Sequence, residues 1–86
     1  MIFHINISIM PKKALLDPQG KAVKNALSSL NLKVEDVRVG KNISIKIEAE
    51  KKELAISKIE EVCKKLLVNQ ITEEYTYSIT EKKARN

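Results

Sequence analysis

The chain contains one histidine and one cysteine, the two residue types most often used for proton transfer and nucleophilic attack. His4 lies in a run of alternating apolar and polar residues and shares its polar side with Asn6 and Ser8 only. Catalysis would require a nucleophile or a carboxylate beside it. Cys63 lies in the apolar stripe of a predicted helix, whereas a reactive thiolate needs cationic, partly exposed surroundings. We therefore expect a structural or surface role for His4 and a buried, inert thiol for Cys63.

The acidic residues form no evident catalytic pair. Asp17 precedes a proline and is predicted to cap a helix. Asp36 and Glu48 could face each other across the predicted hairpin, but many pairs of charged residues in a small domain could do so, and the pair is therefore no evidence of catalysis. The sequence has no glycine-rich phosphate loop, no HExxH motif and no second cysteine. Gly20-Lys21 could hold an anion at a helix start, but a capped helix explains the pair equally well. The residues thus predict no catalytic, cofactor-binding or metal site.

Length and composition limit the kind of fold that can position these residues. With 86 residues the chain is one small domain, and its 43% apolar content is typical of globular proteins. A domain of this size buries only about 60–65% of its unfolded surface, so self-association would help to stabilise it. No apolar run reaches the ~20 residues that span a bilayer, no secretory signal is evident, and a lone cysteine fits a reducing compartment. We expect a cytoplasmic protein.

Hydropathy periods predict four strands and two helices. Alternation with period two predicts strands over residues 2–10, around residues 37–39, over 43–49 and over 71–79. A tight turn at Gly40-Lys41-Asn42 would join the middle two strands into a hairpin.

Each predicted helix carries an apolar stripe. Asp17-Pro18 is a typical helix start, with a capping carboxylate and then proline at the first helical position. The stripe of this first helix consists of Val23, Ala26, Leu27 and Leu30. The second helix spans residues 51–68, and its wider stripe consists of Ala55, Ile59, Val62, Cys63 and Leu66, flanked by Ile56 and Leu67.

The order β-α-β-β-α-β predicts a ferredoxin-like α+β sandwich, a four-stranded antiparallel sheet with two helices on one face. Two strands would be edges, and unpaired edges favour pairing with another chain. We expect the domain to cover residues 1–80 and a basic, disordered tail to cover 81–86. Side chains of the wide stripe and of the last strand are candidates for the oligomer interface: Ile56, Leu67, Tyr75 and Tyr77.

Three segments of the sequence resemble the PurS family: LDPQGKAV at residues 16–23, VEDVRVGK at 34–41, and CKKLLVN at 63–69 together with residues 71–75. The resemblance runs in register over residues 2–80. It implies a small, non-catalytic subunit of phosphoribosylformylglycinamidine (FGAM) synthase in purine biosynthesis. Such a subunit would join a glutaminase subunit to a large synthetase subunit, so that ammonia from glutamine reaches the amidation of formylglycinamide ribonucleotide.

The resemblance also implies partners and contact residues. The complex would use ATP and Mg²⁺, with no cofactor on this chain, and the chain would pair with itself as a dimer or a dimer of dimers. Two motifs supply candidates for contact with the other subunits, one at the predicted helix start and one at the predicted hairpin turn. They are Asp17, Pro18, Gln19, Gly20 and Lys21 in the first motif and Arg38, Gly40 and Lys41 in the second.

Two other function classes stay open on the residues alone. A net charge of +5 and a pI of about 9.4 permit a basic ferredoxin-like module that binds nucleic acid. However, the predicted strand over 43–47 has no aromatic residue on which bases could stack, which counts against this class. A dimeric regulatory domain that senses a small molecule is the other alternative, and an independent enzyme has the least support. Nothing in the sequence indicates contact with a membrane.

Overall fold

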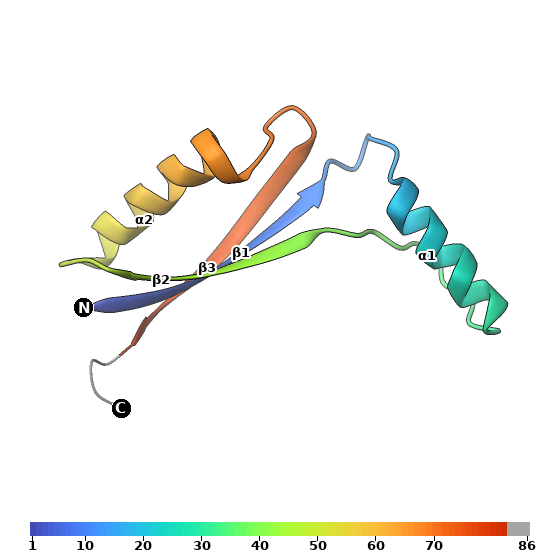
Figure 1. Cartoon of the computed structure of the whole chain (residues 1–86), viewed down its shortest axis with the longest axis horizontal. Coiled ribbons are helices and arrows are strands. Elements are labelled where there is room, and N and C mark those ends of the chain that lie inside the picture. Colours follow the sequence, from blue (N-terminus) through green and yellow to red (C-terminus); the bar gives the residue numbers. More distant parts are fainter. Residues whose placement is uncertain (83–86) are drawn as a thin grey trace.

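Three antiparallel strands form the sheet of this α+β domain, in the order β2-β1-β3, as the computed structural model of residues 1–82 shows (Figure 1). Two helices separate the strands in the chain, and the second continues into one π-helical turn, η1. The elements are β1 (Ile2–Pro11), α1 (Pro18–Ser29), β2 (Lys41–Glu48), α2 (Lys52–Val62), η1 (Cys63–Leu67) and β3 (Glu73–Lys82).

The central strand β1 carries the core. Its apolar side chains Phe3, Ile5, Ile7 and Ile9 are at most 1% exposed. In the middle of the sheet their partners in both neighbouring strands are also apolar, and Ile5, for example, lies opposite Ile45 of β2 and Ile79 of β3. At the ends of the sheet, Phe3 lies opposite Glu81 and Ile9 opposite Lys41. The alternation predicted for the first strand is therefore confirmed, and register places one side of all three strands in the core.

Helix α2 covers that side of the sheet. Ala55, Ile59 and Cys63 are buried against it, as the predicted stripe requires. The Val68 amide donates to the Cys63 carbonyl at 3.0 Å, an i to i+5 bond that widens the last turn. The wider turn shifts the helical phase, so that Leu67 packs on the core while Leu66 is 77% exposed. Burial of Leu66 was therefore a wrong expectation.

Helix α1 does not lie on the sheet. It projects beyond the end of the strands, apart from α2 (Figure 1), and its only buried residue is Gly20. Of its predicted stripe, Val23 is 41% and Leu30 76% exposed. The Cα radius of gyration is 16.8 Å, against about 12 Å for a compact domain of this length. The predicted placement of two helices on one face is therefore wrong. We refer to residues 12–38 as the arm, and to residues 1–11 and 39–82 as the body.

The strand predicted around residues 37–39 is absent from the described residues. The chain from residue 33 to residue 40 has no regular strand, and β2 begins at Lys41 without a turn. The physical reason is a lack of pairing partners, because β2 pairs with β1 while residues 35–37 lie against α1 instead. The predicted hairpin and its turn at residues 40–42 are therefore wrong.

The last strand is longer than predicted. β3 runs to Lys82 and so includes two residues that were assigned to the basic tail. The rest of that predicted tail, residues 83–86, lies outside the described residues. In residues 1–82 we find no helix with the length and apolar character needed to cross a bilayer.

Candidate functional site

Asp17 links the two chain segments that leave and re-enter the sheet. Its Oδ1 accepts a hydrogen bond from the Gly20 amide and caps α1, while its Oδ2 accepts from the Val39 amide, both at 3.0 Å. These two amide donors, helped by the nearby Arg38 charge, lower the pKa of Asp17 below its usual value. The predicted cap is confirmed, and the second bond to Val39 is a role that only the tertiary structure gives it.

Gly20 allows the return segment to approach α1 closely. A Cβ at this position would collide with the Val37 carbonyl oxygen and with the Asp17 carboxylate. Farther along the helix, the Lys24 ammonium donates to the Glu35 carbonyl at 2.9 Å. A glycine in the first turn of a helix is therefore explained by backbone contact rather than by helix propensity.

Arg38 joins the return segment to the end of β1. Its guanidinium donates to the carbonyl of Pro11, the last residue of β1. The Arg38 side chain is half-buried, and this bond uses part of its hydrogen-bonding capacity within the chain. Asp17, Gly20, Arg38 and Val39 thus form the junction between arm and body, which we call the hinge cluster.

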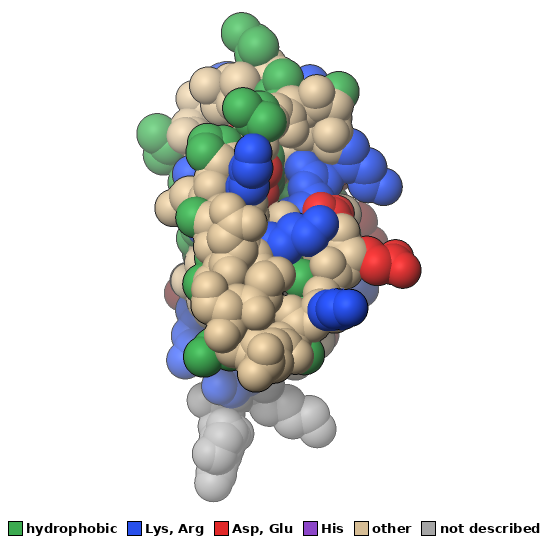
Figure 2. Space-filling model, turned by 90° about the vertical axis from the view of Figure 1, so that its right-hand side faces the viewer, with side chains coloured by type: hydrophobic (Ala, Val, Ile, Leu, Met, Phe, Trp, Pro, Cys, Tyr) green, Lys and Arg blue, Asp and Glu red, His purple; other side chains and the backbone are tan. Residues whose placement is uncertain are grey.

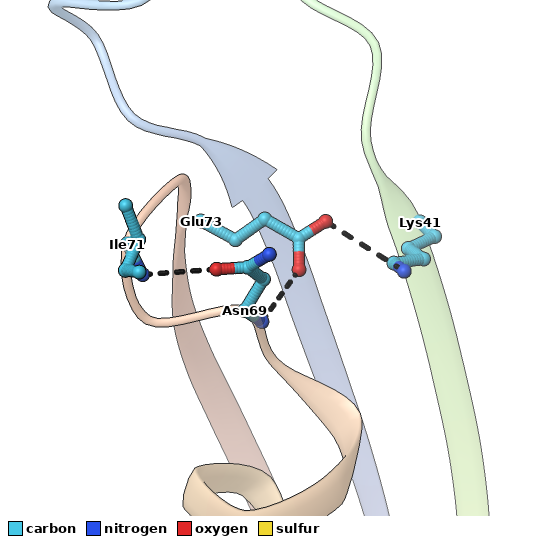
Figure 3. A network of polar contacts seen from close by, with 4 residues as sticks. All are labelled: Lys41, Asn69, Ile71 and Glu73. Atoms are coloured by element: carbon cyan, nitrogen blue, oxygen red, sulfur yellow. Dashed lines mark hydrogen bonds and ion pairs between the residues drawn. The ribbon is translucent and has the colours of Figure 1, made fainter.

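A second polar network lies beside the hinge cluster, where β2 and β3 begin (Figure 3). The Glu73 carboxylate accepts from the Asn69 amide at 2.9 Å and lies 3.6 Å from the Lys41 ammonium. The Asn69 side chain accepts from the Ile71 amide at 3.0 Å, which closes a tight turn after η1. This network fixes the loop between α2 and the last strand against the start of β2.

The eight predicted contact residues come together around two adjoining clefts. The larger, of about 700 Å³, is lined by Asp17, Gly20, Lys21 and Arg38. The smaller, of about 400 Å³, is lined by Asp17 and the remaining candidates, Pro18, Gln19, Gly40 and Lys41. Sequence reasoning did not single out Lys13 and Lys24 of the larger cleft or Glu73 of the smaller one, because their spacing gives no signal. The structure brings the candidates together, and their contact with partners stays a prediction.

The four oligomer-interface candidates are all half-buried residues of the body. Leu67, Tyr75 and Tyr77 pack against the core. The Tyr77 hydroxyl donates to the Glu60 carboxylate at 2.9 Å, which together with burial raises the pKa of Tyr77. Ile56 lies on α2 outside this cluster. Their surroundings within the chain explain three of them as core residues, and a role in self-association is untested.

The two side chains that could have been catalytic, those of His4 and Cys63, make contacts within the chain. His4 lies on the polar side of β1, where its Nε2 is 2.7 Å from the Ser44 hydroxyl. Cys63 is fully buried, and desolvation together with the Glu60 charge raises the pKa of its thiol. Residues 1–82 contain no group of three His, Cys, Asp or Glu side chains that could hold a metal ion.

Comparison with known proteins decides the family. The model of the PurS family, described as phosphoribosylformylglycinamidine (FGAM) synthase, matches residues 4–81. The chain belongs to the PurS family. The PurS subunit of FGAM synthase from Bacillus subtilis is 37% identical over 81 residues, which cover 93% of this chain and 95% of that protein. The resemblance noted in the sequence is therefore confirmed.

Solved PurS structures share the fold. Thermus thermophilus PurS superposes with a TM-score of 0.88 at 36% identity, covering 96% of this chain and 100% of that one. A chain in the structure of PurLQS from Thermotoga maritima superposes with a TM-score of 0.88 at 32% identity, covering 93% and 99%. The extended arm thus belongs to a fold that other PurS-family members share.

Proposed function

We propose that this chain is the small, non-catalytic subunit of an FGAM synthase and that it holds a glutaminase subunit and a large synthetase subunit together. The observation that carries the proposal is the PurS-family match over residues 4–81, together with the similarity to a chain of PurLQS. In such a complex, ammonia released from glutamine would reach the amidation of formylglycinamide ribonucleotide without entering bulk water. ATP and Mg²⁺ would act on the synthetase subunit.

The geometry supports a scaffold in two ways. The arm leaves the hinge cluster with apolar side chains exposed on Val23 and Leu30, which another chain could cover. The eight contact candidates line two clefts beside that hinge, so one partner could contact several of them at once. Neither feature requires this chain to perform chemistry.

Self-association is part of the proposal. Within residues 1–82, β2 and β3 are the edge strands of the sheet and pair on one side only, and the middle of β3, from Tyr75 to Thr80, carries no charged residue. Such an edge is available for pairing with a second copy. The exposed stripe of α1 offers an additional apolar surface that a dimer would bury. We expect a dimer or a dimer of dimers.

Reconstitution tests the function. The synthetase and glutaminase subunits are assayed with and without this chain, with either glutamine or ammonium as the nitrogen source. A scaffold should restore synthesis from glutamine, while synthesis from ammonium already proceeds without it. If neither rate responds and no ternary complex is detected by analytical ultracentrifugation, the proposal is wrong. Binding of single-stranded RNA at low salt would then favour the nucleic-acid alternative.

A further inference from the structure

The positive charge of the described chain is concentrated in the arm. Within residues 12–38, three acidic residues stand against six basic ones, which leaves a net charge of +3. The body, residues 1–11 and 39–82, has eight acidic and eight basic residues and is neutral. The six basic residues of the arm are Lys12, Lys13, Lys21, Lys24, Lys33 and Arg38.

Four of these basic side chains gather at one place. Lys13, Lys21, Lys24 and Arg38 line the larger cleft, and Figure 2, which views the molecule from the arm end, shows basic side chains grouped on this side. Within residues 1–82, none of the four forms an ion pair. Two carboxylates, those of Asp17 and Asp36, also line the cleft, and Asp17 already accepts two backbone hydrogen bonds. Four basic side chains against two acidic ones leave the cleft with an excess of positive charge.

The cationic cleft and the apolar stripe lie on different faces of α1. At 100° per residue, the pair Lys21 and Lys24 lies about 140° around the helix from the pair Val23 and Leu30, with Gly20 between them. Gly20 and Lys24 contact the return segment at residues 35–37, which makes this part of the helix one wall of the cleft. The basic and the apolar side chains of α1 therefore form two distinct surfaces.

We propose that the cationic cleft of the arm binds an acidic surface of a different protein chain, one of the two larger subunits of the synthase. Leu15 and Leu16 line the same cleft and are exposed, so the partner surface should place apolar side chains among its carboxylates. Complementary charge would raise the association rate and fix the orientation of the partner. This proposal rests on the proposed function and names the chemistry of the contact within it.

Two other occupants fit the observations less well. A second copy of the chain would bring to this cleft either its arm, with a net charge of +3, or its body, with a net charge of zero, and neither supplies excess negative charge. Single-stranded nucleic acid would supply it, but the arm has no aromatic residue for base stacking, since Phe3, Tyr75 and Tyr77 all belong to the body. Exposed aliphatic side chains beside lysines are better matched by a protein surface.

Charge reversal tests the cleft with the full chain and both larger subunits. The double variant Lys13→Glu/Lys21→Glu changes two exposed side chains that form no hydrogen bond or ion pair among the described residues. Glutamate near the start of α1 also suits the helix dipole, so α1 should stay folded. The matched control Lys46→Glu/Lys51→Glu makes the same change of charge on two exposed residues of the body. Circular dichroism verifies the fold of each variant.

The expected result is an arm-specific, salt-dependent loss. At low salt the arm variant should associate with one larger subunit about tenfold or more slowly in stopped-flow measurements, and the difference should shrink at high salt. The body control should stay within about twofold of the unchanged chain. Equal effects of the two double variants, or association that does not depend on salt, would overturn the proposal.

Four further outcomes separate the alternatives. If the arm variant changes the oligomeric state in sedimentation, the cleft binds a second copy and the proposal is wrong. It is equally wrong if the unchanged chain binds a single-stranded RNA of about 20 nucleotides through the same lysines. If the unchanged chain restores synthesis from glutamine while the arm variant does so equally well, the cleft proposal fails and the scaffold function stands. If the unchanged chain binds neither subunit, the proposed function itself fails.

Discussion

Helices α1 and α2 are both amphipathic, yet only one of them is covered by its own chain. The stripe of α2 places Ala55, Ile59 and Cys63 against the sheet, whereas the stripe of α1 leaves Leu30 three-quarters exposed. The charges differ in the same way, since the body is neutral and the arm carries +3. The body therefore packs on its own core, whereas the arm leaves apolar and basic side chains exposed, which we propose other chains cover.

The sharpest test of this contrast compares a core residue with an arm residue. Ile5→Ala removes a fully buried side chain from the centre of the sheet and should lower the free energy of unfolding by about 2–5 kcal/mol. Leu30→Ala should change it by less than about 0.5 kcal/mol at concentrations where the chain is monomeric. Urea denaturation followed by circular dichroism measures both. Equal losses would show that the arm is packed within the monomer.

The contrast also predicts which exposed leucine matters for self-association. Leu30 and Leu66 are 76% and 77% exposed, the first on the arm and the second on η1 of the body. Leu30→Glu should raise the dimer dissociation constant by about tenfold or more, because a charge would enter the buried stripe. Leu66→Glu should leave it within about twofold. Analytical ultracentrifugation distinguishes the two, and matched effects would remove the α1 stripe from the dimer interface.

A third test asks whether the arm is held in place by backbone contact. Gly20→Ala would stabilise an ordinary helix interior by about 1 kcal/mol, but here the added methyl group meets the Val37 carbonyl. We expect a loss of about 1–3 kcal/mol instead, with faster amide exchange along α1. Ala22→Gly, at an exposed position of the same helix, should cost only the propensity difference of about 1 kcal/mol. A stabilised Gly20→Ala variant would contradict the observed approach of the return segment.

The smallest expected effect is the pH dependence of the hinge cluster. The folded pKa of Asp17 is lowered, chiefly by hydrogen bonds from the Gly20 and Val39 amides. Its contribution to stability is therefore present above the unfolded pKa and is lost as the pH falls through the folded pKa. Chemical shifts of those two amides should follow this titration in the folded protein. Asp17→Asn should remove this titration, whereas Asp36→Asn, on an exposed side chain, should leave it intact.

Local patterns predicted most of the elements. The alternation of Phe3, Ile5, Ile7 and Ile9 predicted the central strand, and the pair Asp17-Pro18 predicted the start of α1. The extent of the second helix was also correct, although its last turn is π-helical. The π turn escaped prediction because one wider turn shifts the helical phase without any change of composition.

The errors concern pairing between segments. Val37 and Val39 alternate as a strand would, but no strand of the described chain pairs with them, because Gly20 and Asp17 hold this segment against the start of α1. The contact candidates came from two motifs of the family resemblance, and their contact with partners stays a prediction. Their convergence on two clefts, and the addition of Lys13 and Lys24 to them, depends on the path of the arm.

By itself, the sequence determined the periodicities, the helix start at Asp17, the core face of β1 and the family, because each depends on neighbouring residues or on motifs read in register. The tertiary structure alone decided that α1 leaves the sheet and that four of the six basic residues of the arm line one cleft. The physical reason is that an apolar stripe specifies that it must be covered, but not which surface covers it. That choice is made by contacts between distant segments, here the bonds of Asp17 to Val39 and of Arg38 to Pro11.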